Sequence, residues 1–473
     1  MKILEAVTNP IFKNIAEVAE EINQETYVVG GFVRDYLLNR GQKKDIDFVT
    51  IGNGILLAKE LSNKLGNTSQ VSVFKRFGTA MFKYEQTDLE FVGARKESYS
   101  EDSRKPHVED GTLEDDQKRR DFTINTLAIS MNKATFGELI DPFNGVEDLE
   151  NKIIKTPLEP NITYSDDPLR MMRAIRFAAQ LNFEIEKNSF QAIIDNAERI
   201  NIVSFERVMD EFQKIMMTDK PSVGLLLLEQ SGLLQYILPE LIALKGIEEV
   251  EGQKHKDNFY HTLEVVDNIS INTDNVWLRW AALLHDIGKA VTKRFDKKVG
   301  WTFHSHEFVG SKMVVKIFRR LKLPMGNQMK YVKKLVMMSS RPIAVVTDDA
   351  TDSALRRLLF DAGEDFEDLI ILCKADITTK NEKKQRRFKQ NFEVVEQKIK
   401  DVEERDRVRN FQPPISGEQI MEIFGISPGK EIGIIKNAIK EAILEGEVEN
   451  NYNSALEFVI NLGKELNLEP KNI

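Results

Sequence analysis

The sequence predicts an α+β protein in which a small mixed sheet with helices is followed by an almost entirely helical remainder. Strand-length apolar runs occur in the first third of the chain: YVVGG, DIDFVTIG, TAMFKY and DLEFVGA. After about Tyr164 these runs stop, and apolar residues recur at helical spacing, as in SFERVMDEFQKIMM and NVWLRWAALLHDIG. The segment YVVGGFVRDYLL predicts a strand, a Gly-Gly turn and a helix in direct succession.

The order of these segments predicts four domains, with the sheet in the first and helices in the others. Their expected ranges are residues 1–155, 156–249, 250–400 and 401–473, with the linker FQPPISGEQ before the tail. The first domain begins with an amphipathic helix over residues 1–23. Residues 95–118 are polar and lack any periodicity, which predicts a long loop.

Composition sets further limits. The 473 residues suffice for three or four domains of about 100–200 residues each. The single cysteine, Cys373, excludes an internal disulfide and fits a reducing compartment, so we expect a cytoplasmic location. The first residues lack the features of a signal peptide, and no apolar stretch approaches the roughly 18 residues of a membrane span.

Two acidic residues stand at alternate positions of a predicted strand. Side chains at i and i+2 of a strand point to the same face, so we expect the carboxylates of Asp45 and Asp47 to converge. Hard oxygen ligands at that spacing suit Mg²⁺, and a Mg²⁺ pair can activate a hydroxyl and stabilise a leaving pyrophosphate. Glu90, on another predicted strand, is expected to supply a third acid. The alternative is a pair of solvated acids on an exposed strand.

The Gly-Gly turn precedes these acids along the chain. At Gly30 and Gly31 the backbone can approach a phosphate closely, and amides at the helix start face the anion. Such turns are common, but Arg34 and Asp35 follow this one, and the Asp-x-Asp strand comes soon after. The combination favours a nucleotide-binding site over an ordinary turn.

Four motifs in order carry a family resemblance: GGFVRD, DID, RRDFTINTLA and DDPLRMMRAIRFAA. They resemble the class II tRNA nucleotidyltransferases and bacterial poly(A) polymerases. The resemblance implies template-independent addition of CMP and AMP from CTP and ATP to a tRNA 3′ end, with release of pyrophosphate. In this family a long loop between the first two motifs accompanies addition of the terminal A, so residues 95–118 favour full CCA addition.

The resemblance also assigns nucleotide-binding residues beyond Gly30, Gly31 and Arg34. It implies that one motif holds the ribose and phosphates, through Arg119, Arg120, Asp121 and Asn125. Arginine suits this role because its planar guanidinium makes bidentate phosphate contacts. Without the family, the same segment reads equally well as the start of a surface helix, with Asp121 and Thr123 as caps.

Base selection is implied for Asp167 and Arg170. In a helix they would share one face, where a carboxylate can accept from the amino group common to C and A. The alternative is an intrahelical ion pair. Arg173 and Arg176 continue the helix and are expected to contact phosphates. Asp166 stands where the family has Glu, while Glu206 and Arg207 read as structural residues.

A histidine cluster marks the third domain. Five of the six histidines lie between residues 255 and 306, including the His285-Asp286 pair and His304-x-His306. Such clusters suggest a transition-metal site. The pattern resembles the HD phosphohydrolase superfamily, which implies metal ligands at His261, His285, Asp286 and Asp376. Ser339 stands where two-metal members have histidine, so we expect a mononuclear site, with an inactive structural HD fold as the alternative.

The net charge of −9 is unusual for an RNA-binding enzyme, so any RNA contact depends on local clusters. Two clusters are candidates, Lys312 to Lys334 and Lys383 to Lys389, and ordinary solvated helix faces are the alternative. Three other functions remain open. They are poly(A) or A-only addition, hydrolysis of phosphate esters by the HD domain behind a degenerate head, and RNA binding without catalysis.

Overall fold

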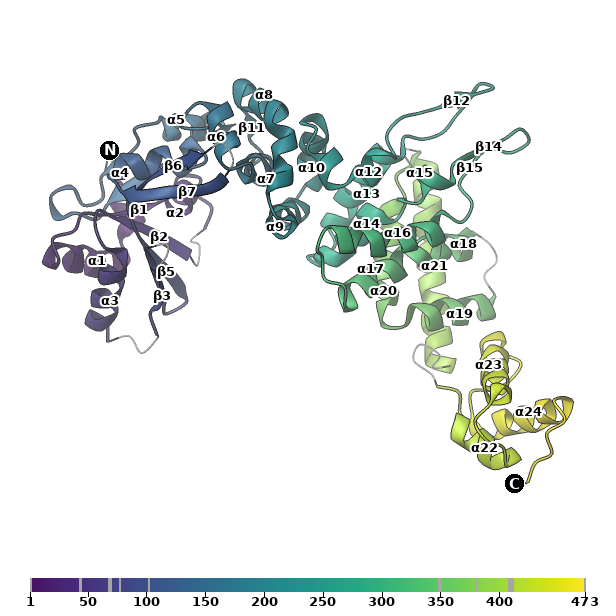
Figure 1. The fold of residues 1–473 in the computed structure, drawn as a ribbon. Helices are drawn as coiled ribbons and strands as arrows, with labels where there is room; N and C mark the ends of the chain where they lie inside the picture. Colours follow the sequence, from purple (N-terminus) through teal and green to yellow (C-terminus); the bar gives the residue numbers. More distant parts are fainter. Residues whose placement is uncertain are drawn as a thin grey trace. The chain divides into compact units, whose positions relative to one another are not determined.

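The computed structural model describes residues 2–41, 45–66, 70–75, 78–100, 103–347, 351–379, 381–406 and 412–471. The chain divides into two compact units, Met1–Pro239 and Glu240–Ile473 (Figure 1). The first holds the mixed sheet and the second is mostly helical, as the sequence predicts. The finer division into four domains stays a prediction.

A seven-stranded mixed sheet forms the core of the first unit, in the order β3-β4-β5-β2-β1-β8-β9. Strands β2 and β5 run parallel, and the other neighbouring pairs are antiparallel. The strands are β1 (Thr26–Val29), β2 (Asp45–Thr50), β3 (Ser72–Phe74), β4 (Thr79–Tyr84), β5 (Thr87–Gly93), β8 (Ala128–Ser130) and β9 (Leu139–Ile140).

One face of this sheet is apolar and packs against two helices, α1 (Pro10–Glu21) and α3 (Gly54–Lys64). The rings of Phe48 and Phe91 stack with centroids 5.0 Å apart, and the Phe12 ring lies 6.1 Å from that of Phe48. Strand side chains alternate between faces, so Asp47 and Glu90, each one residue before these phenylalanines, point to the opposite face.

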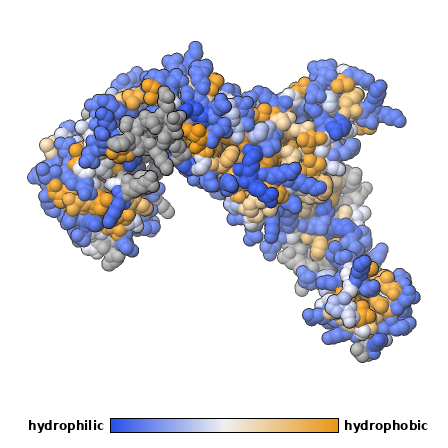
Figure 2. Space-filling model, viewed as in Figure 1, coloured by the Kyte–Doolittle hydropathy of each residue, from blue (hydrophilic) through white to orange (hydrophobic). Residues whose placement is uncertain are grey.

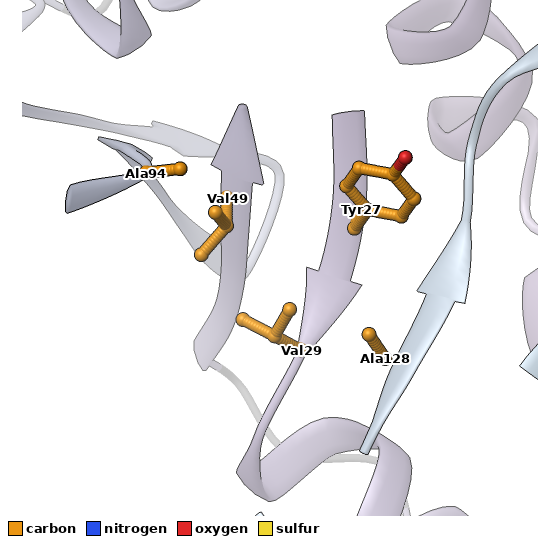
Figure 3. Packing of buried hydrophobic residues seen from close by; sticks show 5 residues of the cluster. All are labelled: Tyr27, Val29, Val49, Ala94 and Ala128. Atoms are coloured by element: carbon orange, nitrogen blue, oxygen red, sulfur yellow. The ribbon is translucent and has the colours of Figure 1, made fainter. Parts of the chain in front are cut away.

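The sheet face that carries Asp47 and Glu90 is also partly apolar. Tyr27, Val29, Val49, Ala94 and Ala128 form a buried cluster there (Figure 3). Leu113, from α4 (Leu113–Lys118), packs against the cluster. Helix α4 thereby lies on the side of the sheet that carries the acids.

The predicted loop at residues 95–118 is wrong. Strands β6 (Arg95–Ser100) and β7 (Ser103–Asp110) form an antiparallel hairpin, and helix α4 follows it. Backbone hydrogen bonds pair the two strands of a hairpin whatever the side chains are, so such strands need no apolar alternation. Helix α4 begins at a capping box in which Thr112 and Asp115 satisfy each other's backbone amides.

Helices fill the rest of the first unit. They are α2 (Gly31–Leu37), α5 (Gly145–Glu150), α6 (Pro160–Asp166), α7 (Leu169–Leu181), α8 (Lys187–Asn196), α9 (Phe205–Met216), α10 (Pro221–Gln230) and α11 (Leu234–Ile237), with α12 (Pro239–Ile242) at the division. Two short strands, β10 (Ile153–Ile154) and β11 (Glu184–Ile185), pair in parallel.

The helix predicted over DDPLRMMRAIRFAAQL is interrupted. Helix α6 ends at Asp166, and α7 begins at Leu169. Asp167 has φ −133° and ψ 95°, the extended conformation that a following proline favours, and that proline is Pro168. Asp167 therefore lies in a bend between two helices rather than inside one.

The second unit contains α13 (Asn258–Ser270), α14 (Val276–Leu284), α15 (Lys289–Thr292), α16 (His306–Arg320), α17 (Asn327–Met338), α18 (Arg341–Thr347), α19 (Asp352–Ala362), α20 (Phe366–Asp376) and α21 (Glu382–Asp406). The predicted all-helical block also contains two hairpins, β12 (Glu249–Val250) with β13 (Gln253–Lys254), and β14 (Arg294–Asp296) with β15 (Gly300–Thr302). The indole of Trp301 donates to the Gln253 carbonyl at 3.1 Å and so joins the hairpins.

Three helices form the tail: α22 (Gly417–Phe424), α23 (Lys430–Glu445) and α24 (Tyr452–Glu465). Arg357 of α19 pairs with Glu441 and Glu445 of α23, both at 2.6 Å. The predicted linker before the tail falls partly on residue 411, outside the described residues. The visible surface is mainly hydrophilic (Figure 2), and none of the described helices is both long and apolar enough to cross a membrane.

Candidate active site and metal centre

The predicted acids meet on one face of the head sheet. The parallel register of β2 and β5 pairs Asp45 with Asp88 and Asp47 with Glu90. Asp45 and Asp47 are exposed, and Glu90 is half-buried. Burial raises the pKa of Glu90, and the neighbouring charges of Asp47 and Asp45 raise it further. Clustered carboxylates with this mutual repulsion form a donor set that fits a hard cation. The sequence prediction did not include Asp88.

The Gly-Gly turn brings the backbone close to these acids. Gly30 has φ +70° and ψ −128°, a conformation that favours glycine. A Cβ at this position would lie 3.0 Å from Nη1 of Arg120 and 4.0 Å from Oδ2 of Asp47. The turn thus leaves room for a guanidinium and a carboxylate beside the backbone.

Two cavities meet at Asp47, Arg119 and Arg120. One, of about 460 Å³, is rich in arginine; its lining residues include Gly30, Gly31, Arg34, Asp121, Asn125, Asp167, Arg170, Arg173, Arg176, Phe177 and Arg207. The other, of about 400 Å³, lies over the sheet and is lined in part by Phe74, Thr79, Glu90, Val92 and Arg95. The predicted nucleotide-binding residues therefore share one cavity beside the acids.

A fully buried carboxylate holds the two arginines common to both cavities. Asp116 accepts from Nε of Arg119 and from Nε of Arg120, both at 2.9 Å. Burial opposes ionisation of Asp116, but the guanidiniums of Arg120 and Arg119 outweigh it and hold its pKa below the usual value. The sequence prediction missed Asp116. Its three- and four-residue spacing from the arginines is a signal only on a helix, and the sequence had predicted a loop here.

Asp121 is at the centre of a second network. Its Oδ1 accepts from Nδ2 of Asn125 at 2.9 Å, and its Oδ2 accepts from Nε of Arg173 at 2.7 Å. Burial opposes its ionisation, but Arg173 and the hydrogen bond from Asn125 lower its pKa to about 2. Asn125 in turn accepts from Nη1 of Arg34 at 2.7 Å. Asp121 therefore orients nucleotide-binding candidates through bonds that occupy both its oxygens.

An aromatic ring underlies the arginine cavity. The guanidinium of Arg176 lies 3.9 Å from the centroid of the Phe177 ring, and those of Arg34 and Arg173 lie 4.8 and 5.6 Å from it. Cations over a ring face are attracted by its quadrupole. Phe177 was also missed from the sequence, where it reads as an ordinary core residue of α7.

The two predicted base-reading residues both line the arginine cavity. Asp167 accepts from the backbone of Leu169 at 3.3 Å, and its carboxylate lies 3.9 Å from the guanidinium of Arg207. Arg170 donates to the carbonyl of Arg119 at 2.5 Å. Arg207, interpreted as structural from the sequence, thus belongs to the same cavity and faces Asp167.

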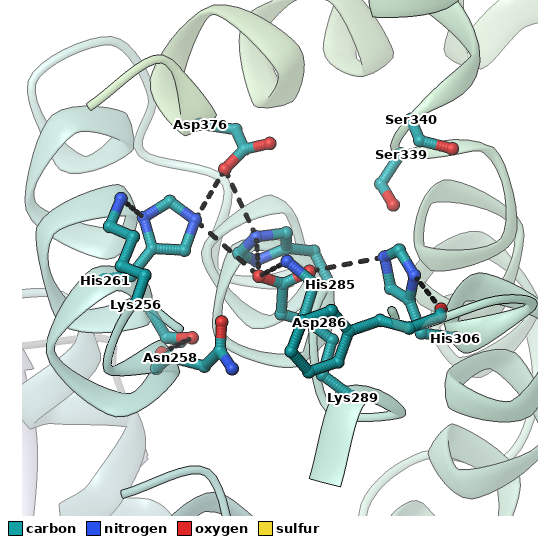
Figure 4. A network of polar contacts seen from close by, with 12 residues as sticks. Lys256, Asn258, His261, His285, Asp286, Lys289, His306, Ser339, Ser340 and Asp376 are labelled. Atoms are coloured by element: carbon teal, nitrogen blue, oxygen red, sulfur yellow. Dashed lines mark hydrogen bonds and ion pairs between the residues drawn. The ribbon is translucent and has the colours of Figure 1, made fainter. Parts of the chain in front are cut away.

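In the second unit, four predicted metal ligands converge (Figure 4). Donor atoms of His261, His285 and Asp286 lie within 4.8 Å of one another, and all three residues are buried. Asp376, at the end of α20, lies with Oδ1 2.8 Å from Nε2 of His261 and 3.4 Å from Nε2 of His285. Helix α13, the turn that follows α14 and the end of α20 therefore bring these side chains together.

The donor set fits a divalent metal ion. Nδ1 of His285 hydrogen-bonds the Ala282 carbonyl at 2.7 Å, which directs Nε2 toward the cluster. Nε2 is buried and makes no hydrogen bond with any residue in the described ranges. Burial disfavours a charged His285, but Asp286 and Asp376 outweigh it and raise its pKa to about 10. Buried negative charge of this kind can be balanced by a metal ion.

On the side that faces His306 and Ser339, Asp286 has fewer possible metal ligands around it. Its Oδ1 lies 3.4 Å from Nε2 of His306, whereas its Oδ2 lies 2.7 Å from Nζ of Lys289. Ser339 is buried nearby, and its hydroxyl donates to the Val336 carbonyl at 3.0 Å. His304, the other member of the His-x-His pair, is exposed. The clustering of histidines in sequence thus overstates the number that face the centre.

The basic clusters lie on helices. Lys312, Lys316 and Arg319 are exposed along α16. The stretch from residue 308 to 347 contains no aspartate or glutamate. The cluster at Lys383 to Lys389 lies on α21, and part of it falls on side chains outside those described. Contact of these clusters with RNA stays a prediction.

Three family models match the chain. They are the poly(A) polymerase head domain at residues 26–155, a probable RNA- and SrmB-binding site of polymerase A at residues 182–245, and the HD domain at residues 258–380. An A-adding tRNA nucleotidyltransferase of Deinococcus radiodurans is 33% identical over 347 residues, which cover 71% of this chain and 76% of the relative. A multifunctional CCA protein of Aliivibrio salmonicida is 31% identical over 368 residues, 74% and 84% of the two chains.

Solved structures share the fold. A Thermotoga maritima CCA-adding enzyme complexed with tRNA superposes with a TM-score of 0.63 at 20% identity, covering 98% of this chain and 99% of that one. A CCA-adding enzyme in complex with ATP gives a TM-score of 0.66 at 21% identity, with the same coverage.

Proposed function

The chain belongs to the class II tRNA nucleotidyltransferase and poly(A) polymerase family and carries an HD domain, and we propose that it completes the CCA end of tRNA. The reaction is attack of an RNA 3′-hydroxyl on the α-phosphate of CTP or ATP, with release of pyrophosphate. No nucleic-acid template takes part, because protein side chains select the base.

The observation that carries this proposal is the meeting of two different cavities at Asp47. The arginine-rich cavity offers planar cations for a triphosphate, and the other cavity passes over Glu90 and the sheet. A triphosphate in the first and an RNA 3′ end in the second would bring α-phosphate and hydroxyl together beside the acids. Holding two reactants in that geometry is a large part of catalysis.

The acids would hold the metal. Families with this head are metal-dependent, and Asp45 and Asp47, with Glu90 beside them, fit Mg²⁺ by donor type and by their shared face. When bound, Mg²⁺ would lower the pKa of the attacking hydroxyl and neutralise charge on the leaving pyrophosphate. Asp116 and Asp121 keep the arginines aimed at the phosphates.

Base choice is assigned to Asp167 and Arg170. Asp167 sits in the bend between α6 and α7 and lines the cavity, where its partly buried carboxylate can accept from the amino group of C or A. Arg207 and the Leu169 amide fix its carboxylate. Arg170, tied to the Arg119 carbonyl, can donate to ring acceptors. UTP and GTP lack the amino group that this arrangement would recognise.

A-only addition is the second candidate, because the Deinococcus relative is named for it. One experiment separates the two. A tRNA transcript that ends before CCA is incubated with CTP alone, and products are resolved on a denaturing gel. Two added cytidines are expected for the full enzyme. Absence of incorporation with CTP, together with AMP addition to a transcript ending in CC, would leave A-only addition.

The HD domain is proposed as a mononuclear phosphoesterase centre. His261, His285, Asp286 and Asp376 would hold one divalent transition metal, which when bound would activate water toward a phosphate ester. The position of Ser339, where two-metal members have histidine, supports a single ion. Because tRNA is the substrate and Cys373 is unpaired, we place the enzyme in the cytoplasm.

A further inference from the structure

We infer that Phe74 is the stacking platform for the 3′-terminal base of the RNA. The inference rests on the proposed transferase function and deepens it. It assigns the second cavity, over the sheet, to the last nucleotide of the RNA that receives the new residue. Phe74 lines that cavity from β3, two strands away from Glu90 on β5.

The strand register places Phe74 on the same sheet face as the acids. Phe74 of β3 pairs with Thr79 of β4, Thr79 pairs with Val92 of β5, and Val92 pairs with Val49 of β2. Paired residues of neighbouring strands point to one face, and so do residues two apart on one strand. Val92 is two residues from Glu90, and Val49 is two residues from Asp47. All six side chains therefore belong to one face.

The span from the acids to Phe74 suits one nucleotide. Neighbouring strands lie about 4.8 Å apart, so the two steps from β5 to β3 put the Phe74 backbone roughly 10 Å from that of Val92. A ribose with its 3′-hydroxyl at Glu90 and Asp47 would extend its base across Thr79 and Val92 toward the phenyl ring. These two small side chains line the same cavity between the acids and Phe74.

The exposure of Phe74 is unusual for this sheet. Its side chain is 46% exposed, whereas Phe48 and Phe91 are fully buried on the other face and Phe82 is 2% exposed. Packing of the head core does not account for an aromatic ring left open beside a cavity that contains Glu90, Arg95 and Arg119. Aromatic rings in nucleic-acid grooves stack bases, and Arg95 and Arg119 are placed to meet the adjoining phosphate.

Stacking also suits the repeated reaction. An enzyme that adds C, C and A must accept a different 3′-terminal nucleotide at each step in one place. Stacking is tolerant of base identity because every base has a π-face, whereas hydrogen-bond recognition would discriminate among them. In this division, Asp167 and Arg170 select the incoming base, while Phe74 holds whichever base was added last.

Steady-state kinetics of the full chain test the inference. With CTP and a tRNA transcript lacking CCA, Phe74→Ala should raise the KM for RNA about tenfold to a hundredfold, as expected for loss of one stacked base. The KM for CTP should change less than about twofold. Phe74→Trp should restore the RNA KM, whereas Phe74→Leu should not. Leu56→Ala is the matched control, because Leu56 is 39% exposed on α3, the helix that packs on the opposite face of the same sheet.

A direct readout of stacking complements the kinetics. A transcript with 2-aminopurine as its 3′-terminal base is bound without nucleotide, and its fluorescence is recorded. Wild type and Phe74→Trp should quench it more than Phe74→Ala does. Equal quenching by Phe74→Ala, or full rescue of the RNA KM by Phe74→Leu, would overturn the inference. If Asp47→Ala loses nucleotide addition while Phe74→Ala keeps the wild-type KM for RNA, only the role of Phe74 is refuted. If Asp47→Ala stays active, the proposed transferase function itself is refuted.

Discussion

The acids of the head and the candidate metal centre of the HD domain balance their charge in opposite ways. In the head, Asp45 and Asp47 are exposed, and repulsion within the cluster helps to raise the pKa of Glu90. In the HD domain, Asp286 is buried among His261, His285 and Lys289. Burial opposes ionisation of Asp286, yet the charge and hydrogen bond of His285, a hydrogen bond from His306 and the charge of Lys289 hold its pKa well below the usual value.

The arginines of the head sharpen the contrast. Two of the carboxylates that pair with them, Asp116 and Asp121, are buried; Asp116 is not among the residues that line the arginine cavity, whereas Asp121 lines it with both oxygens already bonded. Charge of both signs thus remains available where a triphosphate and its metal would bind. The HD centre has already paired most of its charges internally. The comparison teaches that open charge in the head suits a substrate that enters and leaves, whereas enclosed, mutually paired charge in the HD centre suits the single retained ion proposed above.

The largest effect should follow loss of the head acids. Asp45→Ala or Asp47→Ala should lower nucleotide addition by several orders of magnitude while the fold stays intact, because the metal site would be lost. The measurement is incorporation of CMP and AMP into truncated tRNA transcripts, with circular dichroism as the check on folding. Near wild-type incorporation in either variant would show that the metal assignment is wrong.

The HD centre should be separable from transfer. The double variant His285→Ala, Asp286→Ala should lose its bound metal and any phosphatase or 2′,3′-cyclic phosphodiesterase activity, yet keep nucleotide addition. Metal content of the purified full chain is the measurement, and one ion per wild-type chain is expected.

A matched variant tests the reason for a single ion. Ser339→His would restore a histidine beside His306 and Asp286, and it should raise the metal content above one per chain. Two tightly bound ions in wild type would contradict the mononuclear centre. No metal, under conditions that load histidine-rich sites, would leave the HD domain as a structural scaffold.

A smaller effect should come from the buried acid behind the arginines. Asp116→Asn removes the charge that holds Arg119 and Arg120, so kcat/KM for CTP should fall by about tenfold to a hundredfold, since unpairing one member of a buried pair is costly. Glu114→Gln on the same helix is the control, because its exposed pair with Lys118 at 2.6 Å contributes little. Equal kinetics in the two variants would mean that Asp116 does not position the arginines.

The last effect concerns choice rather than rate. Asp167→Ala should relax base selection more than it weakens triphosphate binding, because a site built to hydrogen-bond a group rejects analogues that lack it. Incorporation of UMP and GMP is compared with that of CMP at matched triphosphate concentrations. If the preference for CMP is unchanged, Asp167 serves only as the partner of Arg207.

Local patterns in the sequence determined most of the helices and many of the candidate site residues of this protein. The spacing of Asp45 and Asp47 on a strand, the glycines before α2 and the His285-Asp286 pair act over a few residues, where backbone geometry fixes which side chains share a face. Helical periodicity likewise predicted the helices of both units. The family motifs added residues whose roles depend on partners far along the chain.

Tertiary structure decided what those local patterns left open. The register of β2 with β5 brought Glu90 to Asp47, and pairing of β3 with β4 put Phe74 on the same face. Pro168 broke the predicted helix and left Asp167 in a bend. Only folding showed that His306 rather than His304 faces Asp286, and that Asp116 lies behind the arginines. Most of these outcomes depend on which side chains are buried and on which distant strands or helices pack together. The spacing of residues along the chain does not encode burial or long-range packing.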